Sequence, residues 1–129
     1  MIVDASALLA VLLEEPEKDT FRDRMLLAEA LSMSPINYLE ASVRADDQRH
    51  PAKGAELDNL MGEFGIRIAT VTAEQAHLAR EAYQRFGKGN HPAKLNLGDC
   101  FAYALSKARG ESLLFKGNDF GLTDVEAAL

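Results

Sequence analysis

A carboxylate follows the first apolar stretch of the chain. Residues 1–3 (Met-Ile-Val) are apolar and too few for a helix, and Asp4 comes directly after them. An apolar run of this kind is typical of a strand buried on both faces, as in a parallel sheet covered by helices. Ser6 and the helix-forming residues 7–13 follow, so Asp4 is predicted to lie where a strand ends and a helix begins. In an open α/β sheet, ligands bind at this edge.

Three further acidic residues occupy comparable places. Asp119 comes shortly after the apolar residues 113–115, and Asp99 lies in the first turn of a helix that begins at Asn96. Glu40 is predicted on the apolar side of another helix. Because the ends of parallel strands meet at one edge of a sheet, we expect the four carboxylates to lie close together.

The place of Glu40 depends on which face of its helix turns inward. Ser34-Pro35 predicts the start of this helix, because Ser is a common N-cap and Pro a common first helical residue. The residues expected to face inward are Ile36, Leu39, Ala41 and Val43. If another face is buried, Glu40 is an ordinary solvated charge.

The other three carboxylates also have simpler interpretations. Asp4 has the residue type of a helix N-cap. Asp99 is a favourable negative charge at a helix N-terminus, and Asp119, after an Asn, has the residue type of a turn former. What favours a functional site is the occurrence of all four at the predicted edge.

A cluster of carboxylates has a specific chemical consequence. Two carboxylates about 4 Å apart repel each other by roughly 4 kcal/mol at an effective dielectric constant near 20. Such a cluster stays ionised only if a cation is bound, and otherwise some members take up protons. Oxygen ligands without His or Cys favour a hard ion, Mg²⁺ or Mn²⁺. A water held by such an ion is a suitable nucleophile for a phosphodiester.

Composition restricts the class of protein. The 129 residues are 47% apolar and 26% charged, which is typical of a single soluble domain. The net charge of −6 argues against a general nucleic-acid binder, but not against an enzyme that approaches nucleic acid through bound cations. The single Cys100 favours a reducing cytoplasm. No signal peptide and no membrane span are predicted.

Apolar strand patterns alternate with helical patterns along the chain. Strands are predicted at residues 1–3, 30–33, 66–71 and 113–115. Besides the helices already described, helical patterns cover about 52–64, 72–86 and 96–109. This alternation predicts a single α/β domain over residues 1–129, with a mainly parallel central sheet flanked by helices.

Four segments together resemble one known family. They are residues 1–6 (MIVDAS), 34–44 (SPINYLEASVR), 95–105 (LNLGDCFAYAL) and 113–125 (LLFKGNDFGLTDV). These segments resemble the PIN-domain ribonucleases and, more narrowly, the VapC-type toxins of bacterial type II toxin–antitoxin systems. The resemblance extends from residue 1 to about residue 125, and its last two segments are the most specific.

The resemblance implies an acidic quartet that surrounds Mg²⁺ or Mn²⁺. Its members would be the four carboxylates already described, of which Asp4 and Asp99 would be the firmest direct ligands. Ser6 matches the hydroxyl residue of the family's opening motif, which supports the site by hydrogen bonding. Asn118 and Asp124 would be supporting neighbours. Ala5 replaces the Thr or Ser often found there, and all four acidic positions are retained.

The resemblance also implies an activity and partners. A cytoplasmic, metal-dependent endoribonuclease is expected, with a structured target such as a tRNA or rRNA loop. The expected partners are an identical subunit and a VapB-type antitoxin that blocks the acidic cleft. Candidate RNA phosphate contacts are Lys94, His91, Lys116 and Arg44. Each of these is equally compatible with a solvated surface charge, since most such side chains are exposed.

Three alternatives to a nuclease make different demands on the sequence. A response-regulator receiver would explain Lys116 after the last strand, but no adjacent acidic pair follows the first strand and no Asp follows residues 66–71. An Asp-x-Asp phosphatase is excluded because residue 6 is Ser. A catalytically silent interaction module on the same fold stays open, and turnover distinguishes it from an enzyme.

Overall fold

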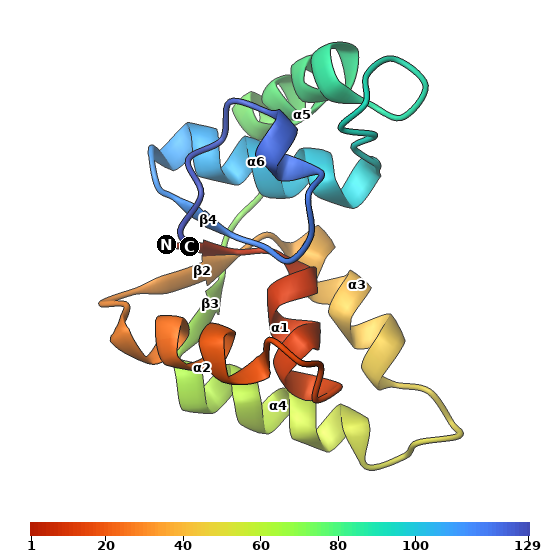
Figure 1. Cartoon of the computed structure of the whole chain (residues 1–129), viewed down its shortest axis with the longest axis vertical. Helices are drawn as coiled ribbons and strands as arrows, with labels where there is room; N and C mark the ends of the chain where they lie inside the picture. Colours follow the sequence, from red (N-terminus) through yellow and green to blue (C-terminus); the bar gives the residue numbers. More distant parts are fainter.

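Four short parallel strands form the centre of the molecule (Figure 1). The computed structural model describes residues 1–129. The strands are β1 (Ile2–Val3), β2 (Leu31–Met33), β3 (Ile66–Ile68) and β4 (Leu113–Leu114). They lie in the order β3-β2-β1-β4, and each neighbouring pair is parallel. The predicted α/β architecture with a parallel central sheet is confirmed.

Helices cover both faces of the sheet. They are α1 (Ala5–Leu12), α2 (Lys18–Leu27), α3 (Pro35–Ala45), α4 (Lys53–Phe64), α5 (Ala73–Phe86) and α6 (Leu97–Arg109), with a short 3₁₀ turn at Phe120–Leu122. Figure 1 shows α5 and α6 on one side of the sheet and α1, α2 and α4 on the other, with α3 beside α1. None of these helices combines the length and apolarity needed to cross a bilayer.

The strands β1, β2 and β4 are buried on both faces, as the sequence predicts. Successive side chains of a strand point to opposite faces. Accordingly, Val3 and Leu114 belong to the core beneath α1 to α4, whereas Ile2 and Leu113 belong to the core beneath α5 and α6. All four side chains are 0% exposed. The two cores thus share the central strands. Their packing fixes the ends of the strands that precede the acidic residues.

The third strand is shorter than predicted. A strand over residues 66–71 is expected from the sequence, but β3 ends at Ile68, which is 49% exposed. This strand lies at the edge of the sheet and pairs only with β2. An edge strand receives ladder hydrogen bonds on one side only, so nothing extends the pairing once β2 ends at Met33.

The predicted inward face of α3 is correct at Ala41 but wrong at Leu39 and Val43. Leu39 and Val43 are 62% and 68% exposed, and Ile36 is only partly buried. The buried residues are instead Asn37, Ala41 and Ala45. These three recur every four residues and carry small or polar side chains, which lets α3 approach its neighbouring helices closely. The predicted N-terminus is correct, because Ser34 Oγ accepts a hydrogen bond from Ile36 N at 3.3 Å.

Candidate active site

Asp4 is fixed at the end of β1. Its backbone N–H donates to Leu114 O at 2.9 Å, so the residue continues the pairing with β4. Its side-chain Oδ2 accepts Ser6 N at 3.1 Å and Ser6 Oγ at 2.5 Å, which makes Asp4 the N-cap of α1. The helix-cap interpretation and the sheet-edge interpretation are therefore both correct. Asp4 is only 5% exposed, and burial raises the pKa of its carboxyl despite these hydrogen bonds.

Ser6 connects two of the site's segments. Its Oγ donates to Asp4, and it also accepts a hydrogen bond from the backbone N–H of Lys116 at 3.0 Å. Lys116 lies in the turn after β4 that leads to Asp119. One hydroxyl thus links the carboxylate after β1 to the segment that carries another acidic residue. This geometry agrees with the supporting role predicted for Ser6.

Glu40 reaches the site from α3 and is held by Asn37. The Asn37 amide Nδ2 donates to Glu40 Oε1 at 2.9 Å and to Gly98 O at 2.9 Å. Asn37 is completely buried, and its Oδ1 has no hydrogen-bond partner. Burial, together with the negative charge of Asp4, raises the pKa of the half-buried Glu40 carboxyl. Asn37 therefore links α3 to the first turn of α6 and orients the Glu40 carboxylate.

Gly98 provides the space into which Glu40 projects. A Cβ built at residue 98 would collide with the carboxylate of Glu40. The absence of a side chain at this position lets the carboxylate approach the backbone of α6. Sequence reasoning missed both Gly98 and Asn37. The available signal was a glycine inside the first turn of a helix, which often has a packing reason.

Asp99 lies in the first turn of α6 in a reciprocal capping box. Asn96 Oδ1 accepts from Asp99 N at 2.9 Å, and Asp99 Oδ2 accepts from Asn96 N at 3.0 Å. Burial, together with the charges of Asp4, Glu40 and Asp119, raises the pKa of Asp99 to about 6. The simpler interpretation, a favourable charge at a helix end, is thus realised in the structure. The negative charges of the other three carboxylates also act on Asp99.

A groove of about 600 Å³ contains three of the four carboxylates. Asp4, Glu40 and Asp99 line it, and apolar side chains form much of the rest of its wall. Asp119 is exposed and lies outside this lining, although its charge is felt by Asp99. No group of three or more acidic, His or Cys side chains lies close enough together to hold a metal ion.

The predicted supporting residues Asn118 and Asp124 lie in different surroundings. Asn118 is exposed in the turn beside Asp119. Asp124 lies outside the groove lining and accepts a hydrogen bond from Tyr103 Oη at 2.7 Å. It also lies 3.3 Å from Lys107 Nζ, so its contacts hold the C-terminal segment against α6.

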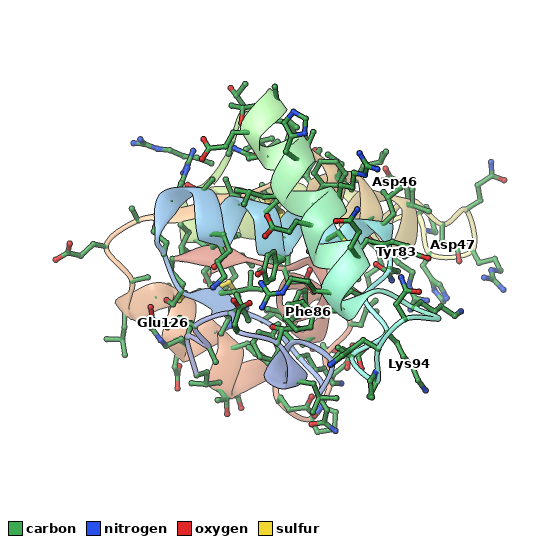
Figure 2. The ribbon with its side chains drawn as sticks, turned by 90° about the horizontal axis from the view of Figure 1, so that it is seen from above. Asp46, Asp47, Tyr83, Phe86, Lys94 and Glu126 are labelled. Carbon is green, nitrogen blue, oxygen red and sulfur yellow. The ribbon has the colours of Figure 1, made fainter.

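Among the four basic residues predicted to contact RNA, only Arg44 lines the groove. Lys116 forms ion pairs with Glu15 and with Glu17, the latter at 2.9 Å. His91 Nδ1 accepts a hydrogen bond from Ala93 N at 3.0 Å. Lys94 is exposed on the loop after α5, where its side chain is labelled in Figure 2.

Replacing Gly98 by Ala tests the contact with Glu40. An exposed Gly→Ala change inside a helix normally stabilises a protein by about 0.5–1 kcal/mol. At Gly98 the new methyl group would displace the Glu40 carboxylate, so we expect the free energy of unfolding in urea to fall. Gly62→Ala is the matched control, since a Cβ there meets nothing within 4 Å and should stabilise α4. Equal stabilisation by both substitutions would contradict this placement of Glu40.

The raised pKa of Asp99 predicts a pH dependence of stability in the absence of divalent ions. The pKa is about 6 in the folded chain against 3.8 for the ordinary carboxyl, so between these values the folded state binds more protons. Stability from this group is therefore fully present below the ordinary pKa of 3.8 and is lost as pH rises through about 6. In EDTA, the melting temperature of wild type should rise between about pH 7 and about pH 5 relative to that of Asp99→Asn. An identical pH dependence of the two proteins would refute the shift.

Comparison with known proteins agrees with the geometry. The family model of the PIN domain matches residues 1–126. Ribonuclease VapC28 of Mycobacterium tuberculosis is 46% identical over 130 residues, which cover 100% of this chain and 98% of the relative. Ribonuclease VapC of Mycolicibacterium smegmatis is 42% identical, with 98% of both chains covered.

A solved structure has the same fold. The crystal structure of Mycobacterium tuberculosis VapC20, described as a sarcin-ricin loop cleaving toxin, superimposes with a TM-score of 0.77. The match covers 96% of this chain and 95% of that chain, at 15% sequence identity. At this identity the structural match shows a shared fold, whereas the sequence matches show membership of the family. The chain therefore belongs to the PIN-domain family and, within it, to the VapC ribonucleases.

Proposed function

We propose that this protein is the toxin of a type II toxin–antitoxin pair, and that it is a Mg²⁺- or Mn²⁺-dependent endoribonuclease. The observation that carries the proposal is the convergence of Asp4, Glu40 and Asp99, from three separate elements, on one groove. Relatives that are named as ribonucleases match nearly the whole chain. An RNA phosphodiester, such as one in a structured tRNA or rRNA loop, is the proposed substrate.

The residues of the groove fit a hard divalent cation. The donors are carboxylate oxygens, which Mg²⁺ and Mn²⁺ prefer. Burial raises the pKa of Asp4, of Glu40 and of Asp99, so each would be stabilised in its charged form by a cation. Asp4 and Asp99 would hold the ion directly, with Glu40 and Asp119 as further oxygen donors. A bound ion supplies a more acidic water and compensates negative charge on the phosphate.

During cleavage, residues of the chain would orient the carboxylates of the groove, and one of these carboxylates would accept a proton. Ser6 and Asn96 each donate to one carboxylate oxygen of Asp4 or Asp99, and this fixes the direction of both groups. Asn37 Nδ2 donates a hydrogen bond to Oε1 of Glu40. Glu40 Oε2 is then the oxygen available to accept a proton from the attacking water. The apolar part of the groove wall limits competing solvent around the scissile phosphate.

The apolar rim of the groove suits a protein inhibitor. Leu39, Val43 and Leu97 are 62%, 68% and 70% exposed, although they border the carboxylates. Exposed apolar side chains grouped in this way are typical of interaction sites. A cognate VapB-type antitoxin that covers this rim would block the acidic residues and keep RNA out.

A homodimer in the cytoplasm is also part of the proposal. A second apolar groove of about 260 Å³ lies between α5 and α6, where Ala79, Tyr83 and Phe101 contribute to its lining. A second copy of the chain would cover these side chains. The buried, unpaired Cys100 is compatible with a reducing compartment.

Removing one carboxylate of the groove should remove RNA cleavage. Asp4→Asn and Asp99→Asn each delete a proposed ligand while keeping the side-chain shape, so we expect cleavage to fall by at least about 100-fold. The measurement is cleavage of total RNA by purified protein with Mg²⁺ or Mn²⁺. Asp58→Asn is the control, because Asp58 is an exposed carboxylate on α4 outside the groove. Undiminished cleavage by either groove variant would refute its role.

Metal binding should stabilise the folded protein. An ion that binds only the folded site adds about 2.7 kcal/mol when its free concentration is 100 times its Kd. Mg²⁺ or Mn²⁺ should therefore raise the melting temperature of wild type and of Asp58→Asn, and raise that of Asp99→Asn less. Calorimetry with and without the ion measures the difference. Equal shifts in all three proteins would mean that Asp99 is not a ligand.

A further inference from the structure

A pocket of about 470 Å³ adjoins the acidic groove and has the opposite charge. It is formed by the end of α3, the connection after it and the beginning of α4. We call it the basic pocket, and its charged or titratable lining residues are Arg44, Asp47, Arg49, His50 and Lys53. Figure 2 shows Asp47 on this connection at the periphery of the molecule.

Positive charge exceeds negative charge in the basic pocket. The lining includes three cations, Arg44, Arg49 and Lys53, and one carboxylate, Asp47, although the whole chain carries a net charge of −6. Charges on an exposed surface act over about 10 Å at 0.1 M salt. A polyanion that enters the pocket therefore responds to these cations and to the nearby carboxylates of the groove, and acidic residues more than about 10 Å away have little effect.

The cations differ in how firmly they are held. Lys53 Nζ donates to Leu12 O at 3.1 Å and lies 2.8 Å from a carboxylate oxygen of Glu56, so its position is fixed. Arg49 donates to Asp47 through Nη2 at 2.8 Å, yet its side chain is 84% exposed. Arg44 is also exposed. The guanidinium groups of Arg44 and Arg49 are thus accessible to a ligand from solvent.

The basic pocket and the acidic groove form one continuous surface. Val43 and Arg44 line both. Glu40 and Arg44 are four residues apart on α3, so they lie on the same face of the helix, about 6 Å apart along its axis. This is close to the spacing between neighbouring phosphates of an extended RNA strand. A strand with one phosphate at the carboxylates would place the next phosphates at Arg44 and in the basic pocket.

We propose that the basic pocket binds the sugar–phosphate backbone of the RNA on one side of the bond to be cleaved. The inference rests on the proposed function and adds a substrate subsite to it. Guanidinium groups match phosphate oxygens in bidentate geometry, which favours Arg44 and Arg49 as the contacts. Contacts to the backbone position the strand without reading its sequence.

Asp47 opposes this binding in the free protein. Its carboxylate accepts hydrogen bonds from the Arg49 guanidinium, which a phosphate would otherwise receive, and its negative charge would repel a phosphate. Asp47→Asn would remove the charge but keep an Oδ1 acceptor for Arg49 N, which now donates to Asp47 Oδ1 at 2.9 Å. The substitution should therefore tighten RNA binding, a change in the direction opposite to that caused by misfolding.

The test measures RNA binding in an Asp99→Asn background, so that the probe is not cleaved. The probe is a fluorescent single-stranded RNA of mixed sequence and about 12 nucleotides, followed over a range of salt concentrations. Each lost phosphate contact should lower the slope of log K against log salt by about 0.7 and weaken binding about fivefold at 0.1 M salt. Arg49→Ala should show this loss, and Asp47→Asn should show tighter binding. Arg67→Ala is the charge-matched control, since Arg67 is exposed on β3 at the other end of α4.

Each outcome decides the inference. Weaker binding by Arg49→Ala and tighter binding by Asp47→Asn, with Arg67→Ala unchanged, would support it. If Arg49→Ala matched Arg67→Ala while the parent bound RNA and wild type cleaved RNA, the basic pocket would be rejected and the proposed function would stand. If polyglutamate displaced the RNA as well as polyuridylate of equal charge, the pocket would be assigned to an acidic protein segment instead. Absence of RNA cleavage by wild type would overturn both proposals.

Discussion

The repulsion between carboxylates at the end of the central strands is the constraint on which the site depends. Asp4 is almost completely buried, and Glu40 and Asp99 are close enough for their charges to affect one another. In water these groups would separate, but the fold does not let them. Burial is the main cause of the raised pKa of each carboxyl, and the charges of neighbouring carboxylates raise the pKa of Glu40 and of Asp99 in addition. A divalent cation at the groove would relieve the repulsion.

Local hydrogen bonds hold the acidic groups in place against this repulsion. The carboxylates of Asp4 and Asp99 also cap the helices that begin beside them, so the elements of the fold and the site use the same bonds. Asn37 is different, because it donates one hydrogen bond to Glu40 within α3 and a second to Gly98 O on α6. The groove then continues past Arg44 into a basic pocket. Acidic and basic side chains thus lie next to each other along one surface.

The features that sequence reasoning found are those that depend on neighbouring residues. Asp4 after a three-residue apolar run and Asp99 in a first helical turn lie where local pattern places them. The inward face of α3 was misread because Leu39 is apolar, yet this residue borders the groove and is exposed. Asn37 and Gly98 were missed because their roles exist only between two helices that are distant in sequence. The apolar pattern of a helix shows which faces could be buried, whereas the neighbouring elements determine which face is buried.

The most direct test of the account is the position of a bound ion. Crystals grown with Mn²⁺ can be measured at the manganese absorption edge, where anomalous scattering locates the metal without reference to the protein. The account predicts one or more peaks in the groove, within ligand distance of carboxylate oxygens of Asp4 and Asp99. A fully occupied manganese site elsewhere, with the groove free of anomalous signal, would contradict the claim that these carboxylates are confined together to hold a cation.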